Sequence, residues 1–138
     1  MLLLAHAGST CALAGLIWVV QLVVYPGFLL VGDGAAWPAV HAAHSRRIAQ
    51  VVTLPWAVQG VTLALLLVRH REPLWLLVAA SVCAVTTVVV TVLVSVPLHE
   101  RLATYDERAA RALVRTNWWR TAAWTAAAGC ALAMLALS

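Results

Sequence analysis

The feature that most constrains this chain is a series of long apolar stretches separated by short polar breaks. Hydrophobic residues make up 64% of the sequence and charged residues only 10%, whereas charged residues make up about a quarter of an average soluble domain. A soluble domain of 138 residues could not bury this much apolar surface, so the surplus is predicted to face lipid. The length suits one domain. We therefore predict a single transmembrane domain over residues 1–138.

Turn and capping residues divide the chain into four predicted helices. Gly32 closes the first helix in a Gly-Asp-Gly turn, and Pro38 stands at a favoured first-turn position of the second. Residues 69–72 form a polar turn, and residues 104–107 match a Ser/Thr-x-x-Glu capping box that opens the fourth helix. The predicted fold is all-α, an integral membrane antiparallel four-helix bundle. The predicted helices cover residues 3–31, 38–69, 73–103 and 105–137.

Two prolines, Pro26 and Pro97, fall inside the last stretches of the first and third predicted helices. A proline inside a helix removes one backbone donor and clashes with the preceding turn. We therefore expect a kink or an early break at each of these positions.

Helix length and arginine content predict how the bundle sits in a membrane. Each predicted helix is about 45 Å long, whereas the hydrocarbon core is about 30 Å thick. The surplus lies at the end that holds the first and third loops, because polar residues precede the apolar runs 51–68 and 121–137. The arginines at that end are Arg46, Arg47, Arg101, Arg108, Arg111, Arg115 and Arg120, and those at the other end are Arg69 and Arg71. The positive-inside rule then predicts cytoplasmic loops and outside termini, in a bacterial inner membrane.

The charged residues favour lipid over nucleic acid as a partner, and the cysteines give no sign of a metal or redox site. Nine arginines and no lysine give a net charge of +4, which favours anionic lipid headgroups, and Arg101, Arg108, Arg111 and Arg115 are interpreted as anchors on them. The sequence contains no aromatic-rich basic platform of the kind that predicts nucleic-acid binding. The three cysteines form no CxxC pair and are interpreted as small apolar residues. The first residues lack a basic segment, so we interpret them as a retained helix rather than a signal peptide.

Polar and aromatic residues form one stripe on each predicted helix, and all four stripes lie toward the arginine-rich end. The stripes are Trp18, Gln21 and Tyr25; His41, His44 and Ser45; Thr87, Thr91, Ser95 and His99; and Asn117, Arg120, Thr121 and Trp124. Polar side chains that face lipid are costly, so the stripes are expected to face one another around a pocket. Gln21 and Arg120 lie deepest in the apolar runs and carry this expectation most strongly.

Three histidines are candidate metal ligands. His41 and His44 stand at i, i+3 on one helix, and His99 on a neighbouring helix could supply a third nitrogen to iron, copper or zinc. Glu100 could complete the shell. Iron or copper is the favoured cofactor, and haem is the less favoured one. The alternative is that these are interfacial histidines that only form hydrogen bonds.

The remaining candidate site residues suit a ligand with a polar oxygen. Asn117 and Arg120 could bind an anionic or carbonyl oxygen, such as that of a quinone, a phenolate or a lipid headgroup. Tyr25 is the third candidate catalytic residue. Gln21 and Trp18 are expected to line the pocket and contact a cofactor.

The tryptophans divide into two groups. Trp37, Trp75, Trp118 and Trp119 suit the two interfacial belts of a membrane protein. Trp18, Trp56 and Trp124 lie deeper, and such residues are more often expected to pack in a core than to line a cavity.

The segments IWVVQLVVYPGF, WPAVHAAHSRRIAQVV, VPLHERL and RTNWWRTAAW resemble those of small, mostly uncharacterised bacterial four-helix membrane proteins that include the anthrone oxygenase-like family. The resemblance covers nearly the whole chain in layout, and its specific part is a proline-ended first helix, a Pro-Leu-x-Glu/Asn-Arg-Leu turn and Asn-x-x-Arg. It implies roles for Asn117 and Arg120, with Pro97 and Arg101 in the turn. His99 stands where the resemblance leads us to expect asparagine.

A weaker likeness is to the haem-containing, membrane-bound protoporphyrinogen oxidases, which are also short and four-helical. His6 and Trp18 are similar in placement. The signature expected after them is replaced by Tyr-Pro-Gly-Phe at residues 25–28, so no haem ligand is assigned from this likeness.

Two classes of function fit the sequence. The first is a membrane oxidoreductase or oxygenase that acts on a lipophilic aromatic or quinone-like substrate entering from the bilayer. The second is a small non-catalytic accessory subunit of a homo-oligomer or larger membrane complex, which binds lipid or partner helices. The enzyme hypothesis predicts that the four stripes converge inside the bundle, whereas the subunit hypothesis predicts that they face outward as a polar seam.

Overall fold

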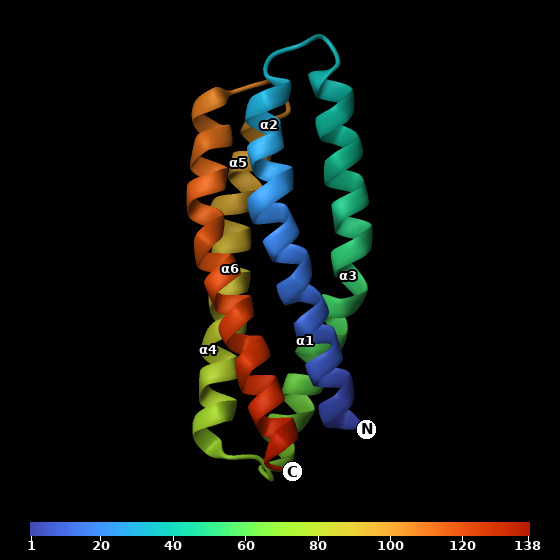
Figure 1. Cartoon of the computed structure of the whole chain (residues 1–138), viewed down its shortest axis with the longest axis vertical. Helices are drawn as coiled ribbons and strands as arrows, with labels where there is room; N and C mark the ends of the chain where they lie inside the picture. Colours follow the sequence, from blue (N-terminus) through green and yellow to red (C-terminus); the bar gives the residue numbers. More distant parts are fainter.

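The computed structural model describes all 138 residues as helices joined by short loops, without strands. Four helical rods run side by side and antiparallel (Figure 1). The rods are α1 (Leu2–Val19), η1 (Val20–Val24) and α2 (Tyr25–Val31); α3 (Trp37–Arg69); α4 (Leu74–Val90), η2 (Thr91–Ser95) and α5 (Val96–Arg101); and α6 (Glu107–Ala136). The predicted all-α four-helix architecture is confirmed, and each rod begins and ends within two residues of its predicted bounds.

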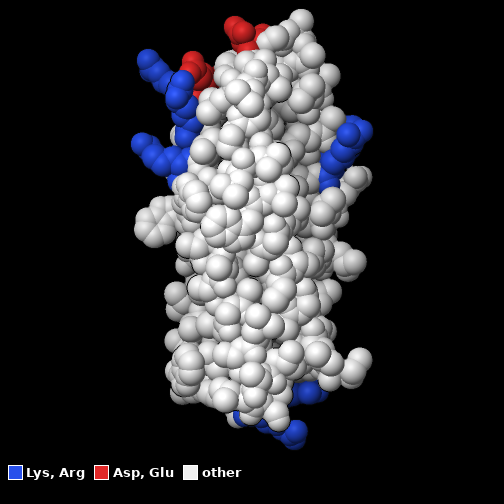
Figure 2. Space-filling model, in the orientation of Figure 1, with Lys and Arg blue, Asp and Glu red and all other residues white.

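The two ends of the bundle differ in what they hold. Both termini and the turn at residues 70–73 lie at one end, and the loops at residues 32–36 and 102–106 lie at the other, which we call the arginine-rich end (Figure 1). On the face drawn in Figure 2, the charged side chains lie toward these two ends, and a wide band between them carries none.

Three of the four rods are long and apolar enough to cross a membrane, namely Leu2–Val31, Trp37–Arg69 and Leu74–Arg101. Many of their large apolar side chains point outward, as Val23, Leu54, Val61 and Leu93 do. A surface of this kind suits lipid rather than water. The fourth rod, α6, differs from the prediction, because its apolar part begins only after Arg120 and falls short of the about 20 residues that a span needs.

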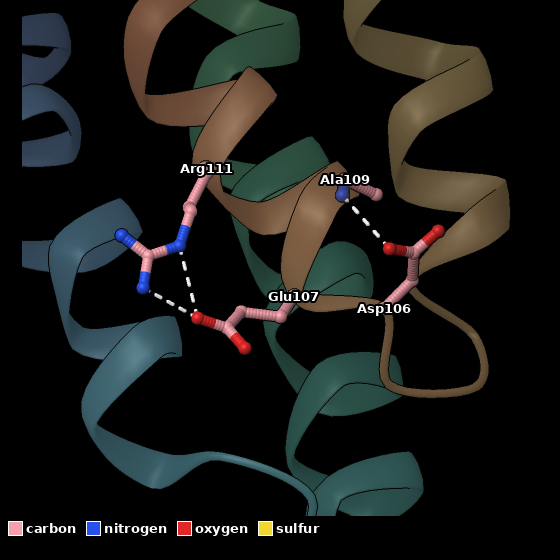
Figure 3. A network of polar contacts seen from close by, with 4 residues as sticks. All are labelled: Asp106, Glu107, Ala109 and Arg111. Carbon is pink, nitrogen blue, oxygen red and sulfur yellow. Dashed lines mark hydrogen bonds and ion pairs between the residues drawn. The ribbon is translucent and has the colours of Figure 1, made fainter.

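The start of α6 corrects the predicted capping box. The helix begins at Glu107, and its N-cap is Asp106, whose Oδ1 accepts a hydrogen bond from the Ala109 N–H at 3.0 Å (Figure 3). Thr104 therefore lies in the loop and does not cap the helix. Asp106 caps the helix in place of Thr104 because its carboxylate also forms an ion pair with Arg101, at 2.6 Å. Arg111 forms an i, i+4 ion pair with Glu107 one turn into the helix.

Pro26 and Pro97 are accommodated by wide π-helical turns instead of sharp kinks, whereas a third interior proline, Pro55, lies within α3. In η1 the Tyr25 N–H donates to the carbonyl of Val20, five residues back, and Pro26 follows at once. In η2 the Val96 N–H donates to Thr91 in the same way, just before Pro97. A proline ring clashes with the carbonyl four residues before it in a regular helix, and a wider turn moves that carbonyl away. Such turns are frequent at functional sites.

The arginine-rich end is closed by aromatic packing over the loops. Trp37 is 1% exposed, and its Nε1 donates to the carbonyl of Leu102 at 2.8 Å. Phe28 and Tyr105 pack edge-on against its ring, with centroids 5.3 and 5.1 Å away. This contact joins the first turn of α3 to the loop that precedes α6, and it fixes the ends of the helices that carry the polar stripes.

Candidate functional site

A cavity of about 300 Å³ lies inside the arginine-rich half of the bundle, bounded by α1, α3, the η2–α5 segment and α6. Most of its wall is apolar. Trp56 and Trp124 form part of that wall, with ring centroids 6.0 Å apart at an angle of 74°. The polar residues that line the cavity are Tyr25, Thr53, Thr91, Ser95, His99 and Arg120.

The cavity opens sideways between α3 and α5. Three of the residues that line it, Ala49, Thr53 and Val96, are also exposed on the outside of the bundle. Ala49 and Thr53 belong to α3, and Val96 is the first residue of α5. A ligand could therefore enter through the apolar side of the bundle.

Arg120 is a cation without an acidic partner at the wall of this cavity. Its Nη1 donates to Ser95 Oγ and to Asn117 Oδ1, each at 3.3 Å, and its guanidinium carbon lies 5.2 Å from the ring centroid of Trp124. Its Nε is buried and has no hydrogen-bond partner. The two ion pairs of the protein do not include Arg120: they are Arg101–Asp106 and Arg111–Glu107, of which Figure 3 shows the second. A partly buried charge without a counter-charge is costly, so it indicates a site for an anionic or strongly polar oxygen.

Asn117 and Gln21 hold Arg120 in place from behind. The Asn117 Nδ2 donates to Gln21 Oε1 at 2.9 Å, and Gln21 Nε2 donates to the Val114 carbonyl at 3.1 Å. Gln21 is 2% exposed and Asn117 1% exposed. Neither lines the cavity, and the expectation that Gln21 contacts a cofactor stays a prediction. The two amides fix the orientation of the Asn117 oxygen that accepts from Arg120.

The histidines form a hydrogen-bonded chain that starts at the cavity. Tyr25 Oη lies 3.2 Å from His99 Nε2, and His99 Nδ1 lies 3.2 Å from His41 Nε2. His44 packs beside them, its ring 6.0 Å from that of His99, and its Nε2 is buried without a partner. Hydroxyl and imidazole groups linked in this way can pass a proton along the chain.

This geometry gives no support to the predicted metal centre. The structure has no group of three or more His, Cys, Asp or Glu residues placed to hold a metal ion. The facing nitrogens of His41 and His99 share a hydrogen bond, and His44 is stacked on His99 at an interplanar angle of 22°. Nitrogen lone pairs lie in the ring plane, so stacked rings do not direct them to one point. Glu100 is exposed and makes no hydrogen bond with the histidines.

Trp18 lies outside the site. It is 38% exposed, its Nε1 donates to Thr125 Oγ1 at 3.1 Å, and its ring packs edge-on against Trp118 at 5.6 Å. It does not line the cavity. Of the candidate site residues, the structure thus brings together Tyr25, His99 and Arg120 at the cavity wall, with the others behind them or apart from them.

Three features of the site were not predicted from the sequence. Trp56 lines the cavity, although deep tryptophans were expected to pack in the core; Trp124, which was also part of the stripe expected to face a pocket, lines it too. The i, i+4 spacing of Arg120 and Trp124 is the signal that could have indicated their cation–π contact. Phe28 packs edge-on against all three histidine rings, with its closest centroid distance of 5.0 Å to His44, and no sequence pattern pointed to it.

Comparison with protein-family models, with curated proteins and with solved structures finds no match to this chain. The resemblance to the anthrone oxygenase-like group therefore stays a prediction, and the function is argued from the site alone.

Proposed function

We propose that this protein is a membrane oxidoreductase or oxygenase that binds a lipophilic phenol or quinone-like substrate in the cavity between α1, α3, α5 and α6. The observation that carries the proposal is the position of Arg120, an unpaired cation at the wall of a mostly apolar cavity. The cavity volume of about 300 Å³ matches the lower end of the range for small-molecule sites.

The shape and lining of the cavity support a substrate with one apolar and one polar part. Trp56 and Trp124 offer aromatic faces to a ring system. A phenolic or quinone oxygen placed at Arg120 would supply the missing counter-charge or acceptor. The sideways opening beside Ala49 and Val96 suits a molecule that arrives dissolved in the bilayer.

The chemistry proposed for the residues is removal of a proton from the substrate. Arg120 stabilises the oxyanion, and Tyr25, next to His99, is the acceptor for the substrate hydrogen. The resulting phenolate is more electron-rich than the phenol and transfers electrons more readily to an oxidant such as dioxygen. No metal forms part of this proposal.

The alternative function, a non-catalytic accessory subunit, is less well supported. It requires polar stripes that face outward toward a partner chain. Here Gln21, Ser95 and Asn117 are each no more than 2% exposed, and Arg120 points to an internal cavity. We further propose that the protein lies in a bacterial cytoplasmic membrane with α6 inserted alongside the other rods, the arginine-rich loops inside and both termini outside, following the positive-inside rule.

Ligand binding by the full chain in lipid nanodiscs tests the proposal. The probe is 4-nitro-1-naphthol, its matched control is 1-nitronaphthalene, which lacks the hydroxyl, and quenching of tryptophan fluorescence reports binding. Charged hydrogen bonds contribute about 1.5–3 kcal/mol, so Arg120→Gln should weaken binding of the naphthol about 10- to 100-fold and leave the control ligand unaffected. Arg115→Gln, an exposed arginine on the same helix, should bind like the parent. Equal affinity of parent and Arg120→Gln for the naphthol would exclude the proposed site.

A second measurement tests the oxidoreductase part separately. With 1,4-naphthohydroquinone as substrate, an oxygen electrode should record faster dioxygen uptake with the parent than with empty nanodiscs or with Arg120→Gln. If all three rates agree although the naphthol binds, the cavity is a binding site and the oxidoreductase assignment fails.

A further inference from the structure

The side chains behind the cavity form a connected path from its wall to the surface of the arginine-rich end. The path starts at Tyr25 and His99, which both line the cavity, and continues to His41, which does not. Each link is 3.2 Å long. The three residues come from the first, third and second rods, so the path exists only in the folded bundle.

His41 connects the path with the outside of the protein. The buried nitrogen and oxygen atoms that lack a partner belong to His44, Ser45 and Arg120 alone. His41 is 6% exposed, and its Nδ1, which has no hydrogen-bond partner, does not belong to these fully buried atoms, so we take this small exposed part of the ring as the outer end of the path. It lies within two turns of the start of α3, beside Trp37, whose ring stacks on His41 at 5.4 Å.

We propose that Tyr25, His99 and His41 conduct a proton between the cavity and the aqueous surface at the arginine-rich end, with His41 as the terminal residue acting through His99. This inference rests on the proposed function, because it takes the substrate hydroxyl as the proton donor. It assigns a role to His41 that neither substrate binding nor packing requires.

The hydrogens balance along the path. Initially the substrate oxygen, Tyr25 Oη, His99 Nδ1 and His41 Nδ1 each carry one transferable hydrogen. The substrate hydrogen moves to Tyr25 Oη, the Tyr25 hydrogen to His99 Nε2, the His99 Nδ1 hydrogen to His41 Nε2, and the His41 Nδ1 hydrogen to water. Four bonds to hydrogen break and four form. The substrate is left as an oxyanion at Arg120, and neither histidine holds a net charge at the end.

The groups around the path favour transfer of the proton from the substrate through the side chains. Arg120 on α6 is the one charged group at the cavity wall, and it stabilises an anion on the substrate. His44 stacks beside His99 without bonding to it, and Phe28 covers the histidine rings from α2. Apolar cover of this kind keeps water out of the path, so the proton has to move through the side chains.

A pH jump on the bound chromophore tests this path. The full chain in nanodiscs is loaded with 4-nitro-1-naphthol, whose naphtholate absorbs in the visible, and a stopped-flow pH jump follows the ionisation of the bound probe. Release of the probe is measured separately by dilution. The expected result is that His41→Ala retains the final absorbance and the affinity but ionises the probe at least about ten-fold more slowly than the parent, and that added imidazole restores the rate.

Control variants separate this inference from the proposed function. His44→Ala, which removes a histidine outside the path, should keep the parent rate. Tyr25→Phe, which removes the first hydroxyl, should slow ionisation as His41→Ala does. A parent rate in His41→Ala, or a slow rate that imidazole does not restore, would overturn the path. If Arg120→Gln loses the bound naphtholate but His41→Ala ionises the probe at the parent rate, the proposed binding site is supported and only the proton path is excluded.

Discussion

Two polar clusters lie inside the same apolar bundle, and they differ in whether their atoms have partners. The first, which we call the His6 cluster, consists of His6, Thr10, Gln59 and Thr62. His6 Nδ1 and Thr62 Oγ1 share a hydrogen bond of 2.9 Å, and the Trp124 Nε1 donates to Gln59 Oε1 at 3.4 Å. No nitrogen or oxygen atom of this cluster is both buried and unpartnered.

The second cluster surrounds Arg120 and is incomplete. It contains a cation without a counter-charge, a buried Nε without a partner, and a cavity of about 300 Å³ beside them. Polar groups inside an apolar environment are costly in either case. The comparison shows that the free-energy cost of burying polar groups is offset within the protein for the His6 cluster, whereas in the Arg120 cluster part of that cost has no internal partner to offset it.

An acidic partner for Arg120 inside the protein should abolish the difference between the two clusters. We expect the largest change in ligand affinity from this substitution. Asn117→Asp places a carboxylate at the position of the Oδ1 that accepts from Arg120 at 3.3 Å. The new charge pairs with Arg120 and repels the naphtholate, so the affinity for 4-nitro-1-naphthol should fall about 100-fold. Titration by tryptophan quenching measures this, and the affinity for 1-nitronaphthalene should stay the same. Unchanged affinity for the naphthol would mean that its oxygen does not bind at Arg120.

Removing a member of the His6 cluster should affect stability and leave binding intact. His6→Ala deletes a side chain that is 2% exposed together with its bond to Thr62. The free energy of unfolding should fall by about 2 kcal/mol, measured by denaturant unfolding in detergent. The affinity for 4-nitro-1-naphthol should not change at temperatures where the variant is folded. A large loss of affinity would show that this cluster also belongs to the binding site.

The smallest effect is expected at the surface of the arginine-rich end, which belongs to neither cluster. The Ala109 N–H and then Arg101 lower the pKa of Asp106 from its ordinary value. A carboxylate with a lowered pKa in the folded state stabilises the protein above its unfolded pKa, and this contribution disappears as the pH falls through the folded pKa. The Tm of the parent should therefore drop slightly more than that of Asp106→Ala on acidification below about pH 4. Parallel Tm curves of the two proteins would contradict the capping role.

The sequence was sufficient for the helices because their signals are strong and local. Long apolar runs, with turn and capping residues such as Gly32 and Pro73 between them, locate each rod within two residues. Gln21 was found by its depth, since a polar residue so far inside an apolar run has to be buried, and Arg120 was found by its position at the start of the apolar run of the fourth helix. The predicted N-cap of α6, Thr104, was wrong because Thr104 and Asp106 are both good capping residues. Only the contact of Asp106 with Arg101 in the folded chain decides between them.

The faces of the helices could not be predicted with the same accuracy. Trp18, Gln21 and Tyr25 share one face of a regular helix, yet Gln21 and Tyr25 are buried and Trp18 points outward. Residues three apart on a regular helix point in directions about 60° apart, so Trp18 lies at the edge of the buried face and packs against Trp118 on the outside. The wide turn of η1 follows Gln21 and changes the phase of the residues after it, which brings Tyr25 to the cavity. The histidines also proved less superficial than expected, since His41 is 6% exposed under packing that only the folded bundle creates.

The two π-helical turns also determine how this chain tolerates changes in length. Each turn contains one residue more than a regular helix would need, so every side chain after it is rotated about 100° relative to the segment before it. Deleting one residue from Val20–Val24 would restore a regular helix and leave its apolar composition intact, but it would rotate Tyr25 and Phe28 away from the histidines. A single-residue deletion at either turn should therefore keep the rods of the bundle but turn the helix after the deletion by about 100°, so that part of its interior face is replaced by residues that now lie outside.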